Sequence, residues 1–177
     1  MVSNTLSNLS TNNMAFKAKK GVFLIKQIVY FDYGGSHSSV TAACIHAGKL
    51  DPNKIPNKDE LMEMPYLDKT NSEDFGKIKH IGTDKDGNEI YSLGTKVSQL
   101  GSMLDDMALL QGVSDQYLFL CTSPYVNNVL RVGGWLSRSA SLPALGRPLV
   151  VSGLRKAYPA LCSFVETTHL RQGGMQQ

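Results

Sequence analysis

The chain has 177 residues, 42% of them hydrophobic and 19% charged, and a formal net charge of +3 at pH 7. These values are typical of a soluble globular domain. No apolar run approaches the roughly 20 residues that a membrane-spanning helix needs, and the N-terminal segment lacks the parts of a secretion signal. We therefore expect a cytoplasmic protein without a membrane partner.

The charge is distributed unevenly along the chain. Residues 1–50 hold five Lys and one Asp, residues 51–115 hold seven Lys and thirteen acidic residues, and residues 116–177 hold five Arg, one Lys and one Glu. The two basic ends favour an anionic ligand. Because their Lys and Arg residues are neither clustered nor interleaved with aromatic residues, nucleic acid is not favoured as that ligand.

The three cysteines, Cys44, Cys121 and Cys162, are far apart and lie in apolar stretches, which indicates buried free thiols. Cys121, near a predicted strand end, is the one that we would test as a nucleophile. No closely spaced ligand pair such as C-x-x-C is present, so no metal site is predicted, although His37 could converge in space with Cys44 and Cys121.

Residues 1–20 are expected to form a disordered tail, and the stretch that follows passes from a strand through a turn into a helix. Ile28–Phe31 has the composition of a buried strand, and Gly34-Gly35 allows a tight turn. Apolar residues then recur at helical spacing up to Gly48, a typical helix stop. They are Val40, Ala43, Cys44 and Ala47. We expect Ser36 or Ser38 to cap this helix.

A helix that begins directly after a glycine-rich turn presents unpaired backbone N–H groups and the positive end of its dipole, which is an anion site in outline. The hydroxyls of Ser36, Ser38 and Ser39 and the ring of His37 would add donors. The stretch contains no Walker lysine and does not spell G-x-G-x-x-G, so a purely structural turn is the alternative.

Residues 49–76 are polar and punctuated by proline. Asn57, followed three residues later by Glu60, predicts the start of a short helix that ends before Pro65, and Asn71 begins a second polar helix start. Such an excursion is either a covering flap or a lid over a site.

Residues 77–94 predict a β-hairpin, with strands at 78–83 and 89–93 and a turn at Asp86-Gly87. A helix is expected over 97–110 and a buried strand at 117–121. The next turn, 122–128, has a Thr or Ser cap before Pro124 and leads into a helix. A third buried strand is predicted at 148–151, a short helix at 154–158 that Pro159 ends, a last strand at 162–166, and a frayed tail from 171 to 177.

Strands that alternate with helices predict one α/β domain over residues 21–170, with three layers, a largely parallel central sheet, helices on both faces and an inserted hairpin. Ligands bind such sheets beyond the carboxyl ends of the strands. Three turns should therefore converge on one pocket. The catalytic candidates are His37 and Asp32, and the ligand-binding candidates are Gly34, Gly35, Ser36, Ser38, Ser39, Thr122, Ser123, Asn127, Ser152 and Arg155.

His37 would act as a general acid or base, or as a donor to an oxyanion; a capping histidine is the alternative. Asp32 would hold Mg²⁺ accompanying a nucleotide or orient His37, or serve as a structural turn carboxylate. Arg155 would pair with a phosphate or lie in solvent. Arg131 and Arg138 are interpreted as surface residues, and Trp135 as a core residue.

Four motifs carry a resemblance to a known family. They are Tyr-Phe-Asp-Tyr-Gly-Gly-Ser-His-Ser-Ser at 30–39, Ile-Pro-Asn-Lys-Asp-Glu-Leu at 55–61, Ile-Gly-Thr-Asp-Lys-Asp-Gly-Asn-Glu-Ile-Tyr-Ser-Leu-Gly at 81–94 and Leu-Gly-Arg-Pro-Leu-Val at 145–150. Over roughly residues 26–168 the chain resembles the Firmicutes domain-of-unknown-function family 3189. The resemblance supplies no catalytic residues, and the distribution of the family implies an association with sporulation.

The function expected from these patterns is the binding of a phosphate-bearing small molecule or nucleotide at residues 33–39. If the site is catalytic, the reaction class is phosphoryl transfer or hydrolysis through His37. The alternative is a non-catalytic interaction or assembly protein in which residues 49–76 contact a partner. A homo-oligomer is compatible with either function.

Overall fold

A computed structural model describes residues 27–97, 100–139 and 142–174. Its centre is a four-stranded sheet with the order β2-β3-β1-β4. The strands are β1 (Gln27–Asp32), β2 (Ile78–Thr83), β3 (Glu89–Gly94) and β4 (Tyr117–Cys121). β1 pairs in parallel with both β3 and β4, whereas β2 pairs with β3 in the antiparallel direction. The predicted α/β class with a mostly parallel sheet is confirmed.

Helices and turns connect these strands. They are α1 (Ser38–His46), α2 (Lys58–Glu63), the 3₁₀ turn η1 (Ser72–Asp74), α3 (Leu100–Leu110), the 3₁₀ turn η2 (Ser123–Tyr125), α4 (Asn128–Gly134), the π-helical turn η3 (Trp135–Ser139) and α5 (Pro143–Gly174). α2 begins as predicted, because Asn57 and Glu60 form a reciprocal capping box. α5 continues to Gly174, into the segment expected as a C-terminal tail, while the predicted N-terminal tail lies outside the described residues.

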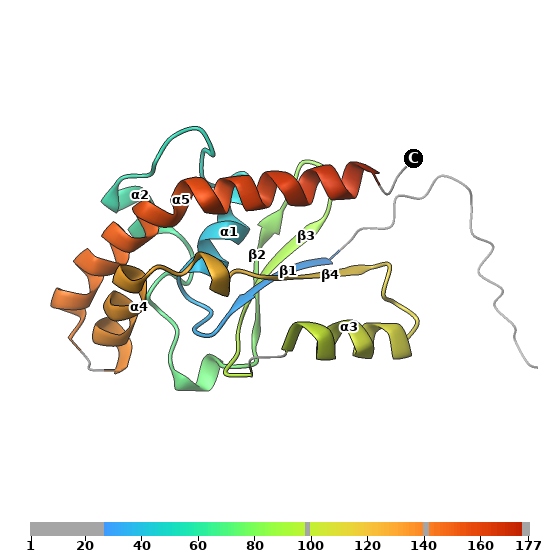
Figure 1. Cartoon of the computed structure of the whole chain (residues 1–177), viewed down its shortest axis with the longest axis horizontal. Helices are drawn as coiled ribbons and strands as arrows, with labels where there is room; N and C mark the ends of the chain where they lie inside the picture. Colours follow the sequence, from blue (N-terminus) through green and yellow to red (C-terminus); the bar gives the residue numbers. More distant parts are fainter. Residues whose placement is uncertain (1–26, 98–99, 140–141, 175–177) are drawn as a thin grey trace, which may run out of the picture.

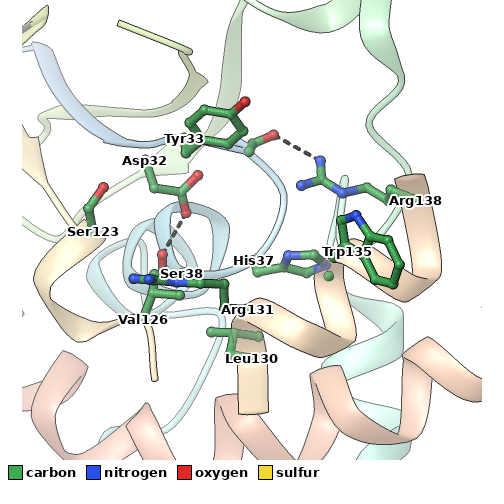
Figure 2. A pocket seen from close by; sticks show the side chains of 12 residues that line it. Asp32, Tyr33, His37, Ser38, Ser123, Val126, Leu130, Arg131, Trp135 and Arg138 are labelled. Atoms are coloured by element: carbon green, nitrogen blue, oxygen red, sulfur yellow. Dashed lines mark hydrogen bonds between the residues drawn. The ribbon is translucent and has the colours of Figure 1, made fainter. Parts of the chain in front are cut away.

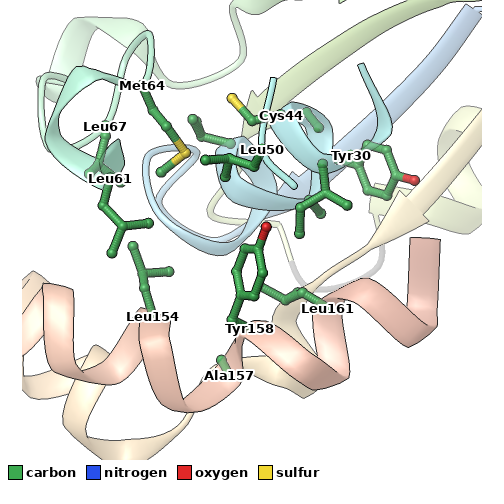
Figure 3. Packing of buried hydrophobic residues seen from close by; sticks show 14 of the residues in the cluster. Tyr30, Cys44, Leu50, Leu61, Met64, Leu67, Leu154, Ala157, Tyr158 and Leu161 are labelled. Atoms are coloured by element: carbon green, nitrogen blue, oxygen red, sulfur yellow. The ribbon is translucent and has the colours of Figure 1, made fainter. Parts of the chain in front are cut away.

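The two faces of the sheet are covered by different helices (Figure 1). On one face, α1 and α5 bury a large cluster that includes Ile28 and Tyr30 of β1 (Figure 3). On the other face, α3 covers a small cluster of Val29, Phe31 and Leu93. Side chains of β1 thus alternate between two apolar environments, which explains why this strand is buried along almost its whole length.

The region predicted as two strands around a short helix is instead one helix, α5, of 32 residues. The strands predicted at 148–151 and 162–166 are therefore wrong, and Pro159 does not end the helix. The buried residues of this region recur every three or four positions, as on one helical face. They are Val150, Leu154, Ala157, Tyr158, Leu161 and Val165. Pro148 and Pro159 lie on the exposed side, so packing of the opposite face sustains the helix despite the lost hydrogen bonds.

The helix expected to start at Pro124 begins four residues later. Residues 123–125 form only a 3₁₀ turn, and the Thr122 side chain does not cap it, because its hydroxyl donates to the Phe31 carbonyl at 3.2 Å. α4 is capped instead by Asn127, whose side-chain oxygen accepts from the Leu130 amide at 2.8 Å.

The thiols are free, as predicted, but they are not all buried. Cys44 is buried on α1, and burial raises its pKa to about 12. Cys162 is half-buried, and Cys121 is exposed because β4 is an edge strand of which no residue is fully buried. The prediction of a buried strand at 117–121 is correct in position and wrong in burial.

A buried group of polar side chains lies at the C-terminal end of α1. The Tyr30 hydroxyl contacts Nδ1 of His46 at 2.6 Å, and Nε2 of His46 lies 3.1 Å from a carboxylate oxygen of Asp84. Burial, together with the neighbouring His169, lowers the pKa of His46 to about 4, so its imidazole is neutral near pH 7.

In the described part of the chain, no helix is long and apolar enough to cross a membrane.

Glycines bring α4 and α5 into close contact. A Cβ atom on Gly153 would lie 2.6 Å from the backbone Cα and N of Leu130, and one on Gly133 would lie 2.6 Å from the Val150 nitrogen. Backbone atoms cannot move aside as a flexible side chain can. The position of α4, which lines the site described below, therefore depends on these two glycines.

We expect Gly153→Ala to lower the free energy of unfolding by about 2 kcal/mol, because overpacking against backbone exceeds the gain in helix propensity. Urea denaturation of the wild type and the variant measures this change in the free energy of unfolding. Gly101→Ala in α3 is the matched control, since its nearest neighbour is the tip of the Phe31 ring at 3.1 Å, and it should change stability by less than about 1 kcal/mol. Equal effects of the two substitutions would contradict the close α4–α5 contact.

Candidate functional site

The carboxyl ends of the three parallel strands meet at one edge of the sheet, where Asp32 lies beside Gly94 and Phe31 beside Cys121. Beyond this edge lies a pocket of about 450 Å³ (Figure 2). Its lining consists of Asp32, Tyr33, Gly34, His37, Ser38, Ser123, Val126, Leu130, Arg131, Gly134, Trp135 and Arg138. Pockets of this size at this edge of a parallel sheet commonly bind small molecules.

The Asp32 carboxylate occupies the N-terminus of α1. One of its oxygens accepts from the Gly35 amide, and the other accepts from the Ser38 hydroxyl at 2.5 Å and from the Ser39 amide at 2.9 Å. The expected cap by Ser36 or Ser38 is thus wrong: His37 is the N-cap residue, its side chain makes no capping bond, and a strand-end carboxylate takes that role. Two amides of the predicted anion cradle are consequently already bound.

The turn between β1 and α1, residues 33–37, which we call the glycine turn, fits tightly against β3. Gly35 has a φ of +60°, and a Cβ atom at this position would lie 2.4 Å from the Cα and N atoms of Gly94. Both the backbone conformation and the close approach therefore require glycine at position 35.

Side chains from distant segments hold the carbonyl groups of the glycine turn. Arg138 of η3 donates to the Gly34 carbonyl at 3.1 Å and to the Ser36 hydroxyl at 2.7 Å. Burial lowers the pKa of Arg138, but a guanidinium remains a cation in a protein. Its Nε atom is buried and has no hydrogen-bond partner among the described residues.

The segment expected to be a flap or a lid is part of the same scaffold. Leu61, Met64 and Leu67 are buried in the main core, so residues 61–67 are packed and do not form a free lid. The Thr70 hydroxyl donates to the Gly35 carbonyl at 3.3 Å, and Lys79 donates to Thr70 at 2.7 Å. Burial lowers the pKa of Lys79.

Asp68, from the same segment, joins four parts of the protein. Its carboxylate accepts from the Ser137 hydroxyl at 2.6 Å and from Nε of Arg147 at 3.1 Å, and it lies 3.4 Å from Nε2 of His37. Its amide donates to the Ser36 carbonyl at 3.3 Å. Burial raises the pKa of Asp68, but these hydrogen bonds outweigh burial and lower it to about 2. Asp68 also has a φ of +51°, a strained conformation that the surrounding contacts must hold.

The open wall of the pocket carries exposed aromatic and basic side chains. Trp135 was interpreted as a core residue, but it is 59% exposed and lines the pocket. Tyr33, at 63% exposure, lines the same pocket, as does Arg131, which is exposed and makes no ion pair within the described residues. Arg138 is half-buried and bound to the glycine turn, so it is not a surface residue.

Comparison with known families agrees with the motifs in the sequence. The model of a family described as "Protein of unknown function (DUF3189)" matches residues 27–169. The chain belongs to the DUF3189 family. No curated protein and no solved structure matches it.

In this DUF3189 protein, five of the predicted site residues lie in the pocket lining and the others do not. Those in the lining are Asp32, Gly34, His37, Ser38 and Ser123. Gly35, Ser36, Ser39, Thr122 and Asn127 lie behind it in structural contacts, such as the Ser92–Ser39 hydrogen bond at 3.1 Å and the bond from Asn127 to the Gly153 carbonyl at 2.8 Å. Ser152 and Arg155 lie on α5 outside the pocket lining, because the predicted third turn is helical.

The lining of this DUF3189 pocket contains cationic and hydroxyl side chains and one imidazole. Arg131 and the hydroxyl of Ser123 are donors at its wall, whereas the Ser38 hydroxyl already donates to Asp32. His37 lines the cavity, and the Asp68 carboxylate, 3.4 Å from its Nε2 atom, orients the ring. Nothing in the sequence pointed to Asp68, since only the fold brings residue 68 to residue 37.

We expect Asp68→Asn to lower the free energy of unfolding by about 2 kcal/mol at pH 7, since the hydrogen bonds to the Asp68 carboxylate lower its pKa to about 2. A lowered carboxyl pKa stabilises the folded state above about pH 4, and this stabilisation is lost as the pH falls from about 4 through about 2. The difference between the wild type and the variant should therefore shrink over that range in urea denaturation. Asp105→Asn on the exposed side of α3 is the control and should show no such pH-dependent difference.

Proposed function

We propose that this protein binds a phosphate-bearing small molecule, with a nucleotide as the preferred class, in the pocket beside the glycine turn. The observation that carries the proposal is the pairing of a free guanidinium, Arg131, with two exposed aromatic side chains, Trp135 and Tyr33, around one cavity. A guanidinium recognises phosphate, and an aromatic side chain provides a surface on which a base or another flat group stacks.

The mode of phosphate recognition differs from that of a backbone cradle. Because Asp32 holds the amides of Gly35 and Ser39 and the hydroxyl of Ser38, the donors left at the wall are the side chains of Arg131 and Ser123. Asp32 already accepts three hydrogen bonds. Mg²⁺ that accompanies a nucleotide would therefore be held mainly by phosphate oxygens and water.

Charge and compartment fit this proposal. The two pocket arginines outnumber the one pocket carboxylate, so the lining favours an anion. The free cysteines fit the reducing environment of the cytoplasm, where nucleotides and sugar phosphates are found, and we place the protein there.

Thermal unfolding of the purified protein against inorganic phosphate, pyrophosphate, ribose 5-phosphate, AMP and ATP tests the proposal. A ligand at 100 times its dissociation constant should stabilise the fold by about 2.7 kcal/mol. Arg131→Ala should weaken the binding of the active ligand about 10- to 100-fold by titration calorimetry, the cost of one hydrogen-bonded charge. Arg155→Ala removes the same charge outside the pocket lining and should leave affinity unchanged.

Trp135→Ala separates a nucleotide from a simple phosphate ester. It should weaken the binding of AMP about tenfold through loss of stacking and leave ribose 5-phosphate unaffected. Equal affinities in the wild type, Arg131→Ala and Trp135→Ala would exclude this pocket as the binding site.

A reaction in this pocket would run through His37. Phosphoryl transfer or hydrolysis needs a group that donates or accepts a proton, and His37 is the lining imidazole, with Asp68 as its partner. His37→Ala should then abolish turnover of the bound phosphate compound while circular dichroism shows an intact fold. An unchanged rate would remove His37 from any mechanism.

The alternative, a non-catalytic interaction protein, rests on a different surface from the one expected. Within residues 49–76, the exposed large apolar side chains are Ile55 and Tyr66, too few for an interface. Exposed apolar residues gather instead on α3, namely Met103, Met107, Leu109 and Leu110. A ligand panel without any stabilising compound would favour this alternative, including a homo-oligomer that buries α3.

A further inference from the structure

We propose that His46, Asp84 and His169 form a binding site for a divalent transition-metal ion of the zinc type, independent of the proposed phosphate pocket. One nitrogen or oxygen atom from each of the three residues lies within 4.8 Å of the others. The residues come from the end of α1, the turn after β2 and the last turns of α5, so only the folded chain brings them together.

The distances fit an ion that needs little rearrangement. Nε2 of His46 is 3.1 Å from the nearer Asp84 oxygen, and two ligand atoms about 2.0 Å from a tetrahedral ion are separated by roughly 3.3 Å. The rings of His46 and His169 have their centroids 4.1 Å apart. The three ligand atoms lie within 4.8 Å of one another, so the most distant pair has to close by up to about 1.5 Å, which a half-buried histidine near the end of a helix allows.

His169, the third residue of the cluster, shows that this is more than a buried hydrogen bond between His46 and Asp84. Nδ1 of His169 is buried and has no hydrogen-bond partner among the described residues. A buried nitrogen without a partner destabilises the folded state. A metal ion between His169 and the His46–Asp84 pair would satisfy that nitrogen.

The surroundings of the cluster resemble the outer shell of a metal site. The Tyr30 hydroxyl lies 2.6 Å from Nδ1 of His46, so when Nε2 binds a metal, Nδ1–H can donate to the Tyr30 oxygen. Asp84 is fixed by the amides of Asp86 and Asn88 and by the Asn88 side chain at 2.7 Å. The His46 ring and the Asp84 carboxylate are thereby oriented before any ion binds.

The donor set indicates the class of ion. Two imidazole nitrogens and one carboxylate oxygen suit Zn²⁺ and related ions, whereas Ca²⁺ and Mg²⁺ prefer oxygen ligands alone. Three protein ligands leave a fourth position for water. Such an ion would fasten the end of α5 to α1 and to the turn between β2 and β3, at the opposite end of α1 from the pocket.

Calorimetric titration of the tag-free, chelator-treated full chain with Zn²⁺ tests the site. The wild type should bind one equivalent and gain thermal stability that a chelator reverses. His169→Ala should weaken binding by about 100-fold or more, at least the upper end of the effect of an outer-shell change. His80→Ala is the matched control, because His80 forms an exposed pair with Glu89 at 2.6 Å outside the cluster, and it should bind Zn²⁺ like the wild type.

X-ray absorption of the Zn²⁺-loaded wild type gives a test that needs no variant. The spectrum should show nitrogen and oxygen ligands with imidazole features and no sulfur. Absence of saturable Zn²⁺ binding, equal affinity in the wild type and His169→Ala, or a sulfur ligand would each overturn the proposal. His37→Ala distinguishes the two sites, because it changes the pocket and should leave Zn²⁺ affinity unchanged.

Discussion

The structure depends most on one carboxylate, that of Asp32, at the N-terminus of α1. It accepts hydrogen bonds from the Gly35 amide, the Ser38 hydroxyl and the Ser39 amide, so the end of β1, the glycine turn and the first turn of α1 form one rigid unit. The same interaction determines how an anion can bind. A negative charge built into the chain satisfies amides that would otherwise attract phosphate. Under the proposed function, phosphate would instead be recognised by side chains of α4 and η3.

Part of the acidic middle of the chain pairs with the basic ends inside the folded protein. Asp68 comes from the acidic part, whereas its partners His37 and Arg147 come from the basic ends. The backbone at Tyr66 and Asp68 has positive φ values of 62° and 51°, and the strain of about 1–3 kcal/mol for each residue is offset by the buried contacts of Leu67 and by the hydrogen bonds of Asp68. Part of the charge that suggested an anionic ligand is thus used within the fold.

α1 connects two polar sites. His37 precedes its first residue and faces the pocket, while His46 is its last residue and faces Asp84 and His169; nine residues at 1.5 Å each separate them by roughly 13 Å. α5 extends along both regions, from Arg147 beside Asp68 to His169 beside His46. α5 thus contacts both regions, through Arg147 in its N-terminal part and through His169 near its C-terminal end.

Local sequence determined the elements whose signals are local. The strand at β1, the glycine turn, the α2 capping box and the antiparallel pairing of β2 with β3 follow from neighbouring residues, and they were predicted from period, glycine and caps. Tertiary structure decided the rest. Packing of one face keeps α5 helical through Pro148, predicted to begin a strand, and through Pro159, predicted to end a short helix. This long helix places Ser152 and Arg155 outside the pocket lining. Tertiary packing also brings Asp68 to His37 and places Arg131 and Trp135 at the pocket wall, because contacts between residues far apart in sequence form only when the core is buried.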